Sequence, residues 1–106
     1  MNYIVNWYLS VTDHRDYPTF EEISLSELDA MVLQLTSKDQ VIYVNNVLPE
    51  GRLLIWGKDT ANISLELQYR AHWYDRDIPK TEFKDYITNM HDIATRPEDY
   101  GFNFGE

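Results

Sequence analysis

The stretch NISLELQYRAHWY, residues 62–74, decides how we expect this chain to fold. Apolar and polar residues alternate along it, which is the pattern of a β-strand with one buried and one solvent-exposed face. The residues assigned to the buried face are Ile63, Leu65, Leu67, Tyr69, Ala71 and Trp73. Those assigned to the exposed face are Asn62, Ser64, Glu66, Gln68, Arg70, His72 and Tyr74. The run is long for one strand, so we expect a bend or a bulge within it.

Other segments rich in β-branched and aromatic residues also predict strands. They are residues 2–11, 40–48 and 52–57. Pro and Gly in the segment 49–51 predict a turn, and residues 58–60 turn the chain again. Clustered charges and Pro predict loops at residues 12–20 and 75–79.

Two segments have the spacing of amphipathic helices. In residues 24–38, Ser24 and Glu27 can form a capping box at the helix start. The apolar stripe of this helix is Leu25, Leu28, Met31, Val32 and Leu35. In residues 80–96, Thr81 can cap the helix and Pro97 stops it. The apolar stripe of this second helix is Phe83, Tyr86, Ile87, Met90 and either Ile93 or Ala94.

This order of elements predicts an α+β fold, a mainly antiparallel sheet with two helices packed on one face. The tail, residues 98–106, adds a short edge strand with Tyr100, Phe102 and Phe104 alternating. A length of 106 residues fits a single domain spanning residues 1–106. The side chains expected to be buried together are Leu28, Val32, Leu35, Leu65, Leu67, Trp73, Ile87 and Met90.

Charge is the most informative property of the whole chain. Eighteen acidic residues face nine basic ones, giving a net charge of −9. Binding nucleic acid by neutralising phosphates needs clustered Lys and Arg, so we expect no direct contact with DNA, RNA or an anionic membrane. Excess negative charge attracts basic partners and speeds encounter with them. Acidity for solubility alone would give the same net charge, so the charge by itself leaves both explanations open.

The chain has no cysteine, which removes thiolate catalysis, disulfides and cysteine-ligated zinc, and which fits a reducing compartment. The first residues, MNYIVNWYLSVTDH, contain neither a basic region nor a long apolar region, so no signal peptide is expected. The longest apolar runs are far shorter than the ~18 residues of a membrane span. We therefore expect a cytoplasmic protein.

Residues with the chemistry of an active site are sparse. The histidines are His14, His72 and His91, and no pair has the spacing of a zinc site. The four glycines form no phosphate-binding loop. His72 with Asp75 and Asp77 is the one constellation that could supply a general base, but no nucleophile or oxyanion stabiliser lies nearby in sequence. We expect a protein that is not an enzyme and that has no cofactor and no metal.

The same region is better interpreted as a contact surface for a protein. The predicted partner-binding residues are Asp59, Glu66, Arg70, His72, Tyr74, Asp75 and Asp77. Outward aromatic and Arg side chains supply contact area, and carboxylates steer a basic partner. An ordinary solvated sheet face with cross-strand pairs is the alternative.

Two stretches resemble the Imm-one family of immunity proteins, which are found beside bacterial polymorphic toxins. SLSELDAMVLQL, residues 24–35, is similar to the family's capped helix of the type S-x-x-E-L-D-x-x-L-x-x-L. TRPEDYGFNF, residues 95–104, is similar to its R-P pair followed by an acidic, aromatic tail. The resemblance also covers the order of elements in outline.

The resemblance implies an immunity protein that binds and neutralises a cognate toxin domain, as in contact-dependent growth inhibition. Such toxins are often nucleases or deaminases with a basic substrate groove, and an acidic inhibitor can block that groove in place of the phosphates. A non-catalytic acidic adaptor or interaction domain of a phage or mobile element is the main alternative. A small hydrolase or ligand-binding protein is a third, minor one.

Overall fold

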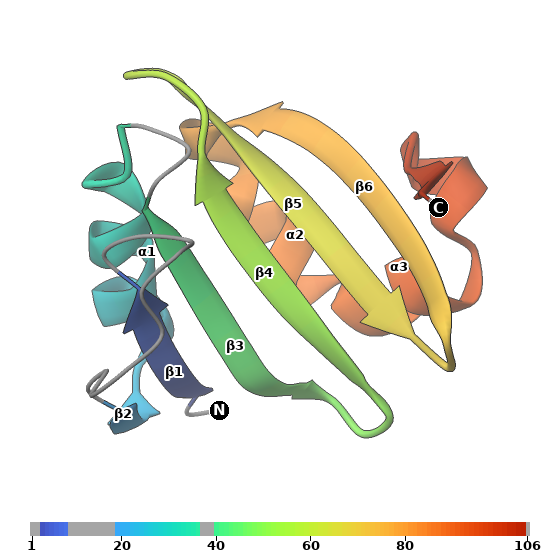
Figure 1. The fold of residues 1–106 in the computed structure, drawn as a ribbon, viewed down its shortest axis with the longest axis horizontal. Helices are drawn as coiled ribbons and strands as arrows, with labels where there is room; N and C mark the ends of the chain where they lie inside the picture. The colour runs from blue at the N-terminus through green and yellow to red at the C-terminus, as the bar shows by residue number, and fades with distance from the viewer. Residues whose placement is uncertain (1–2, 9–18, 37–39, 106) are drawn as a thin grey trace.

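A computed structural model describes residues 3–8, 19–36 and 40–105 of the chain. Within these residues, seven antiparallel strands form one sheet in the order β2-β1-β3-β4-β5-β6-β7 (Figure 1). The strands are β1 Tyr3–Tyr8, β2 Thr19–Ile23, β3 Val41–Leu48, β4 Gly51–Gly57, β5 Asn62–Tyr69, β6 His72–Pro79 and β7 Asn103–Gly105. The helices are α1 Leu25–Leu33, α2 Phe83–Thr88 and α3 Met90–Thr95, with 3₁₀ turns at Lys80–Glu82 and Pro97–Tyr100.

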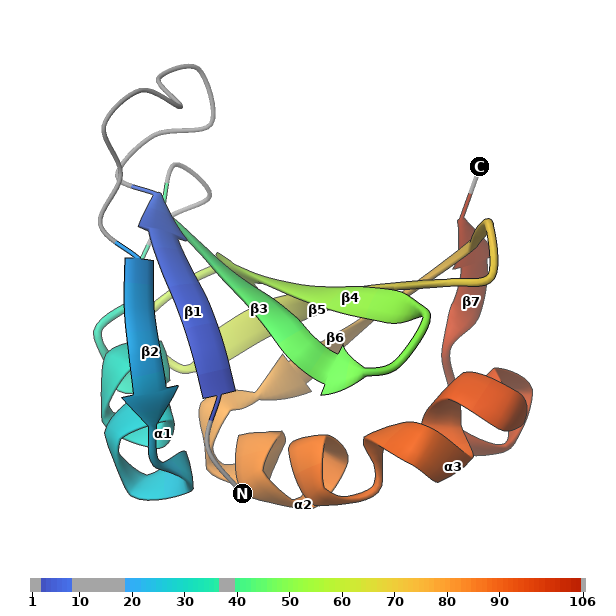
Figure 2. The same cartoon turned by 90° about the horizontal axis from the view of Figure 1, so that it is seen from below.

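In the described part of the chain, the three α-helices lie against one face of the sheet and the other face carries no helix (Figure 2). The predicted α+β fold with helices on one face of an antiparallel sheet is confirmed. Strand β2 was not predicted, because its residues end the segment 12–20 that we assigned to a loop and begin the approach to α1. Within the described residues, no helix has the length and apolar composition needed to cross a membrane.

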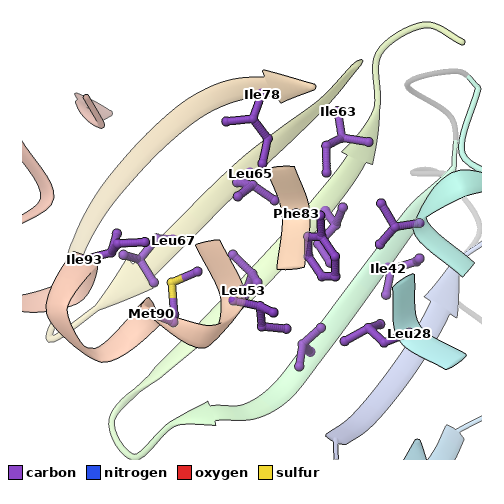
Figure 3. Packing of buried hydrophobic residues seen from close by; sticks show 14 of the residues in the cluster. Leu28, Ile42, Leu53, Ile63, Leu65, Leu67, Ile78, Phe83, Met90 and Ile93 are labelled. Atoms are coloured by element: carbon purple, nitrogen blue, oxygen red, sulfur yellow. The ribbon is translucent and has the colours of Figure 1, made fainter. Parts of the chain in front are cut away.

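The core fills the space between the sheet and the helices. Figure 3 shows Leu28 of α1, Ile42 and Leu53 of the central strands, and Phe83 and Met90 of the second helical segment turned toward one another. The side chains that were predicted to be buried and are buried are Leu28, Val32, Leu35, Leu65, Leu67, Ile87 and Met90. Trp73 is the exception, with 43% of its surface exposed.

Trp73 is exposed because the predicted long strand is really a hairpin. Arg70 and Ala71 have positive φ angles of 50° and 69°, and they form a two-residue turn that pairs Tyr69 with His72. Positive φ at both central residues is the geometry of the turns that suit the right-handed twist of paired strands. Residues 75–79, predicted to be a loop, are the second half of β6.

The turn reverses the alternation for every residue that follows it. Residues paired across two strands point to the same face of the sheet, and Leu67 pairs with Tyr74 while Gln68 pairs with Trp73. The even-numbered residues of β6 therefore face the helices, where the continuous-strand pattern had placed the odd-numbered ones. A slip of one residue moves a whole strand from one face to the other, and this turn has that effect here.

The first helix begins where it was predicted to begin. Ser24 is its N-cap, and its hydroxyl oxygen accepts a hydrogen bond from the backbone N–H of Glu27 at 3.2 Å. The same hydroxyl donates to the Glu27 carboxylate at 2.9 Å, so Glu27 supports the cap through the Ser24 side chain. The helix ends at Leu33, earlier than the predicted residue 38.

A buried lysine stabilises the end of this helix. Lys80 is 4% exposed, and its Nζ donates to the backbone carbonyl of Leu33 at 3.3 Å and to that of Thr60 at 3.0 Å. A cation at the C-terminal end of a helix interacts favourably with the free carbonyls there. Lys80 thus joins α1, the β4–β5 turn and the end of β6.

The predicted second helix is divided. The break lies at Asn89, between α2 and α3, and the Asn89 side-chain amide donates to the carbonyl of Asp85 at 2.8 Å. Thr88 makes a similar bond from its hydroxyl to the carbonyl of Lys84 at 2.7 Å. The Asp85 carbonyl also accepts the backbone N–H of Asn89 at 3.2 Å, so the side-chain bonds accompany the end of α2. The predicted capping role of Thr81 is wrong, since the structure gives the helical segment no side-chain cap.

The C-terminal tail returns to the sheet as predicted and forms its edge strand, β7. Arg76 of β6 holds the tail, because its guanidinium donates to the carbonyl of Tyr100 and lies 5.1 Å from the ring centroid of Tyr86. Gly101 has a φ of 79°, and a side chain there would meet the Arg76 guanidinium. The predicted alternation of Tyr100, Phe102 and Phe104 is wrong, because Tyr100 lies in the 3₁₀ turn, Phe102 is buried before the strand begins and Phe104 is exposed within it.

The reversed alternation in β6 can be tested by measuring the free energy of unfolding of two variants. Leu67→Ala should lower the free energy of unfolding by about 2–5 kcal/mol, because it empties a fully buried position. Trp73→Ala should lower it by about 1 kcal/mol or less, because the ring lies at the surface. Equal losses in urea denaturation would contradict the hairpin and restore the continuous strand.

The turn itself gives a second test. Ala71→Gly should raise the free energy of unfolding by roughly 0.5–1 kcal/mol, because a Cβ is unfavourable at a φ of 69°. Ala30→Gly is the matched control: it lies in α1 and is exposed, and there the change should cost about 1 kcal/mol. Destabilisation by both changes would mean that residue 71 does not have a positive φ in solution.

Candidate functional site

The candidate site is the helix-free face of the sheet, which we call the open face. The register of the strands places its residues in rows that run across β3 to β7. The middle row is Tyr43, Leu54, Glu66, Asp75 and Asn103. The row on one side of it is Val41, Trp56, Ser64 and Asp77, and the row on the other side is Arg52, Gln68 and Trp73.

Apart from Arg52, the residues of these rows over β3 and β4 are apolar or aromatic. Tyr43, Leu54 and Trp56 are partly buried there. The indole Nε1–H of Trp56 is shielded from solvent and has no hydrogen-bond partner among the described residues. A shielded donor without an acceptor is unusual in native structures and is satisfied by water or by a ligand. This half of the face can therefore bury apolar area, and the Trp56 Nε1–H can donate one hydrogen bond to water or to a ligand.

The half of the open face over β5 and β6 is acidic. Glu66 and Asp75 are directly opposite each other in the register, and among the described residues neither carboxylate has a hydrogen-bond or ion-pair partner. Like charges opposite each other on paired strands are destabilising. Asp77 differs, because it receives hydrogen bonds from the ammonium of Lys58 and the hydroxyl of Ser64. Among the described residues of these rows, the carboxylates without a partner are therefore those of the middle row.

Aromatic surface lies beside these carboxylates. Trp73 is two residues before Asp75 on the same strand, so both side chains point to the open face, and 43% of the Trp73 residue is exposed. Exposed aromatics next to a charged rim are typical of protein-binding surfaces. The open face therefore combines apolar contact area with negative charge that has no partner within the described chain.

The predicted partner-binding residues divide between two faces of the sheet. Glu66, Asp75 and Asp77 meet on the open face. His72 and Tyr74 point to the helix side, where their rings pack on Phe104 with centroid distances of 5.6 and 5.4 Å. The prediction that His72 and Tyr74 share a surface with Glu66 is wrong, because the two-residue turn moved them to the opposite face.

Asp59 has a structural role in the β4–β5 turn. Its carboxylate accepts hydrogen bonds from the backbone N–H groups of Ala61 and Asn62, each at 2.8 Å, and from the Asn62 side chain. The bond from the Ala61 N–H, followed by those from Asn62, lowers the pKa of Asp59 below its ordinary value. The stabilisation is therefore present above the pKa of the unfolded chain and is lost as the pH falls through the lower pKa of the folded chain.

Arg70 occupies the strained β5–β6 turn, between the two faces. Its Nε–H donates to the carboxylate of Glu50 at 2.8 Å, and this bond raises the pKa of Arg70. Its guanidinium carbon also lies 5.0 Å from the ring centroid of Tyr69. Arg70 thus belongs to the hairpin tips and not to the acidic rows.

Sequence reasoning missed the apolar half of the face, although β4 carried a signal. In RLLIWG, residues 52–57, Leu54 and Trp56 alternate with the buried Leu53 and Ile55. A strand that is apolar in both phases either is covered on both faces or presents one apolar face to a partner. Only the register with β5 shows that Leu54 and Trp56 lie beside Glu66 and Ser64.

The residues once considered for general-base chemistry do not come together. Because His72 and Asp75 are in different phases of β6, the imidazole lies on the helix side and the carboxylates of Asp75 and Asp77 lie on the open face. Within the described part of the chain, no group of three His, Cys, Asp or Glu side chains could hold a metal ion. His14 lies outside the described residues.

No family model matches the chain, and comparisons with curated proteins and with solved structures find no match either. The proposed function therefore rests on the open face, on the composition of the chain and on the resemblance of residues 24–35 and 95–104. The open face is a sheet surface with exposed aromatic and acidic side chains, and such a surface suits contact with another macromolecule.

The repulsion between Glu66 and Asp75 can be tested by measuring the stability of variants. Asp75→Asn should raise the free energy of unfolding by roughly 0.2–1 kcal/mol at low salt, because it removes repulsion from Glu66. Asp77→Asn should lower it by roughly 0.2–1 kcal/mol, because Asp77 is paired with Lys58 and partly exposed. Denaturation with and without added salt measures both. A loss of stability in Asp75→Asn would show that this carboxylate has a stabilising partner.

Proposed function

We propose that this chain is a non-catalytic immunity protein that binds a basic toxin domain through the open face and blocks its active site. The toxin would be of the nuclease or deaminase type, and the complex would form in the cytoplasm. Two kinds of observation support this proposal. Residues 24–35 and 95–104 resemble the Imm-one family, and the open face has the charge and geometry of a protein-binding surface.

The observation that carries the proposal is the pair Glu66 and Asp75. Two carboxylates directly opposite each other, without a partner in the described residues, reduce the stability of the free protein. A partner that places a Lys or Arg between them removes this repulsion and gains charge-assisted hydrogen bonds. Relief of this repulsion then adds to the free energy of binding.

The apolar residues of the same face support a protein as the partner. Leu54, Trp56 and Trp73 flank the acidic pair and supply area that can be desolvated. Interfaces between proteins concentrate their binding energy in such aromatic residues, surrounded by a charged rim. A small cation would need the carboxylates but would leave the aromatic residues without a role.

The net charge supports a basic partner and a fast encounter. With −9 charges on 106 residues, the chain attracts a positively charged protein over a long range, and association speeds up accordingly. A nuclease or deaminase must itself attract a polyanion, so its substrate groove carries the opposite charge. The acidic face competes with that substrate for the same groove.

The proposal predicts an effect on association with the toxin domain encoded next to the gene for this chain. Glu66→Lys with Asp75→Lys should slow association by about tenfold or more at low salt, because it reverses the charge at the centre of the open face. Stopped-flow or surface-plasmon measurements at two salt concentrations give the rate constant. The double variant should also lose protection against the toxin's activity and should depend less on salt than the natural chain.

A matched control carries the same change of net charge on the helix side. Asp85→Lys with Asp92→Lys alters two exposed carboxylates of α2 and α3 and should leave protection intact. If this control abolished binding while the open-face variant bound normally, the interface would lie on the helices. If the chain bound the toxin domain and left its activity unchanged, it would be an adaptor and not an inhibitor.

A further inference from the structure

The tips of two hairpins enclose a small polar hollow at one end of the open face. The β3–β4 and β5–β6 turns lie at the same end of the sheet (Figure 1). They are joined by a hydrogen bond from the backbone N–H of Arg70 to the carbonyl of Glu50, at 3.4 Å. The hollow has a volume of about 220 Å³ and is lined by Glu50, Gly51, Arg52, Gln68, Arg70 and Ala71.

Its charge is opposite to that of the chain. Two guanidinium groups and one carboxylate line the hollow, whereas the whole chain has a net charge of −9. Within the described part of the chain, the carboxylate of Glu50 accepts a hydrogen bond from the Nε–H of Arg70 alone. Among the described residues, the terminal nitrogens of Arg70 and the whole guanidinium of Arg52 have no hydrogen-bond acceptor.

Each guanidinium group already has a neighbouring side chain in the free protein. Glu50 orients Arg70 at 2.8 Å, and the ring of Tyr43 lies 5.5 Å from the guanidinium carbon of Arg52. The positive φ angles of Arg70 and Ala71 are a further cost at this point, and strain of this kind gathers at functional sites. Donors that are already oriented lose little freedom on binding.

We propose that this hollow is a carboxylate-binding site that accepts an Asp or Glu side chain of the protein partner. This inference rests on the proposed function. The planar fork of Arg52 would hold the carboxylate, with the Gln68 amide and Arg70 beside it. Small-molecule sites usually measure about 300–1,000 Å³, so a hollow of about 220 Å³ suits a side chain better than a metabolite.

With this site, the open face carries positive and negative charge in neighbouring rows. Arg52 is in the row next to Glu66, and it is opposite Gln68 on β5. A partner must therefore present a cation to the Glu66–Asp75 pair and a carboxylate one row away. A purely basic surface would satisfy only the first contact, so the arginine site selects among basic proteins.

The first experiment needs no partner. Sodium acetate is added to ¹⁵N-labelled protein, with sodium chloride at equal ionic strength as the reference, and the Nε–Hε signals of arginine and the Gln68 amide are followed by NMR. The signals of Arg52 and Gln68 should shift saturably with acetate alone. The response should disappear in Arg52→Gln and persist in Arg96→Gln, an exposed arginine outside the hollow. Equal shifts in acetate and chloride would overturn the site.

The second experiment uses the toxin domain encoded by the neighbouring gene. Arg52→Gln should weaken the complex by about tenfold and Arg52→Lys by less, with unchanged midpoints of unfolding, because lysine keeps the charge but not the fork. Binding that needs Glu66 and Asp75 but ignores Arg52→Gln would overturn the site and leave the proposed function standing. Saturable acetate binding without any toxin binding would refute the proposed function alone. Tighter binding of a nucleoside monophosphate than of acetate would overturn the assignment to a protein side chain.

Discussion

The positive φ angles of Arg70 and Ala71 are the constraint on which the rest of the structure depends. They reverse the chain within two residues, so Tyr69 pairs with His72 and each later residue of β6 takes the opposite phase. This phase sends Arg76 and Ile78 toward the helices, where Arg76 holds the C-terminal tail and Ile78 joins the core. It also sends Trp73 and Asp75 to the open face.

The two faces of the sheet differ in composition and in burial. The helix side buries aliphatic side chains in one continuous cluster, and Lys80 closes that layer where α1, the β4–β5 turn and β6 meet. The open face leaves apolar residues of β4 partly exposed beside the carboxylates of β5 and β6. A face that served only to keep the protein soluble would not need Leu54 and Trp56.

The carboxylates of the open face differ in whether they have partners, and the proposed binding site lies where partners are lacking among the described residues. Asp77 and Asp59 show that the chain has the means to satisfy its carboxylates, the first with Lys58 and Ser64 and the second with backbone N–H groups. Glu66 and Asp75 receive no such partner among the described residues. Natural proteins depart from locally consistent choices mainly at functional sites, where another requirement outweighs stability.

The sequence by itself determined the α+β class, the start of α1 at Ser24, the edge strand in the tail and most of the core, because these follow from local propensity and from the spacing of apolar residues. It also determined the acidity that favours a basic partner. Only the tertiary structure decided which acids share a face. Nothing in the dipeptide Arg70–Ala71 signals a turn, since the usual Asn or Gly is absent, and the alternation continues through it without a break. The pairing of β5 with β6 supplies that information, because side chains in a sheet are placed by the strand beside them as much as by their own sequence.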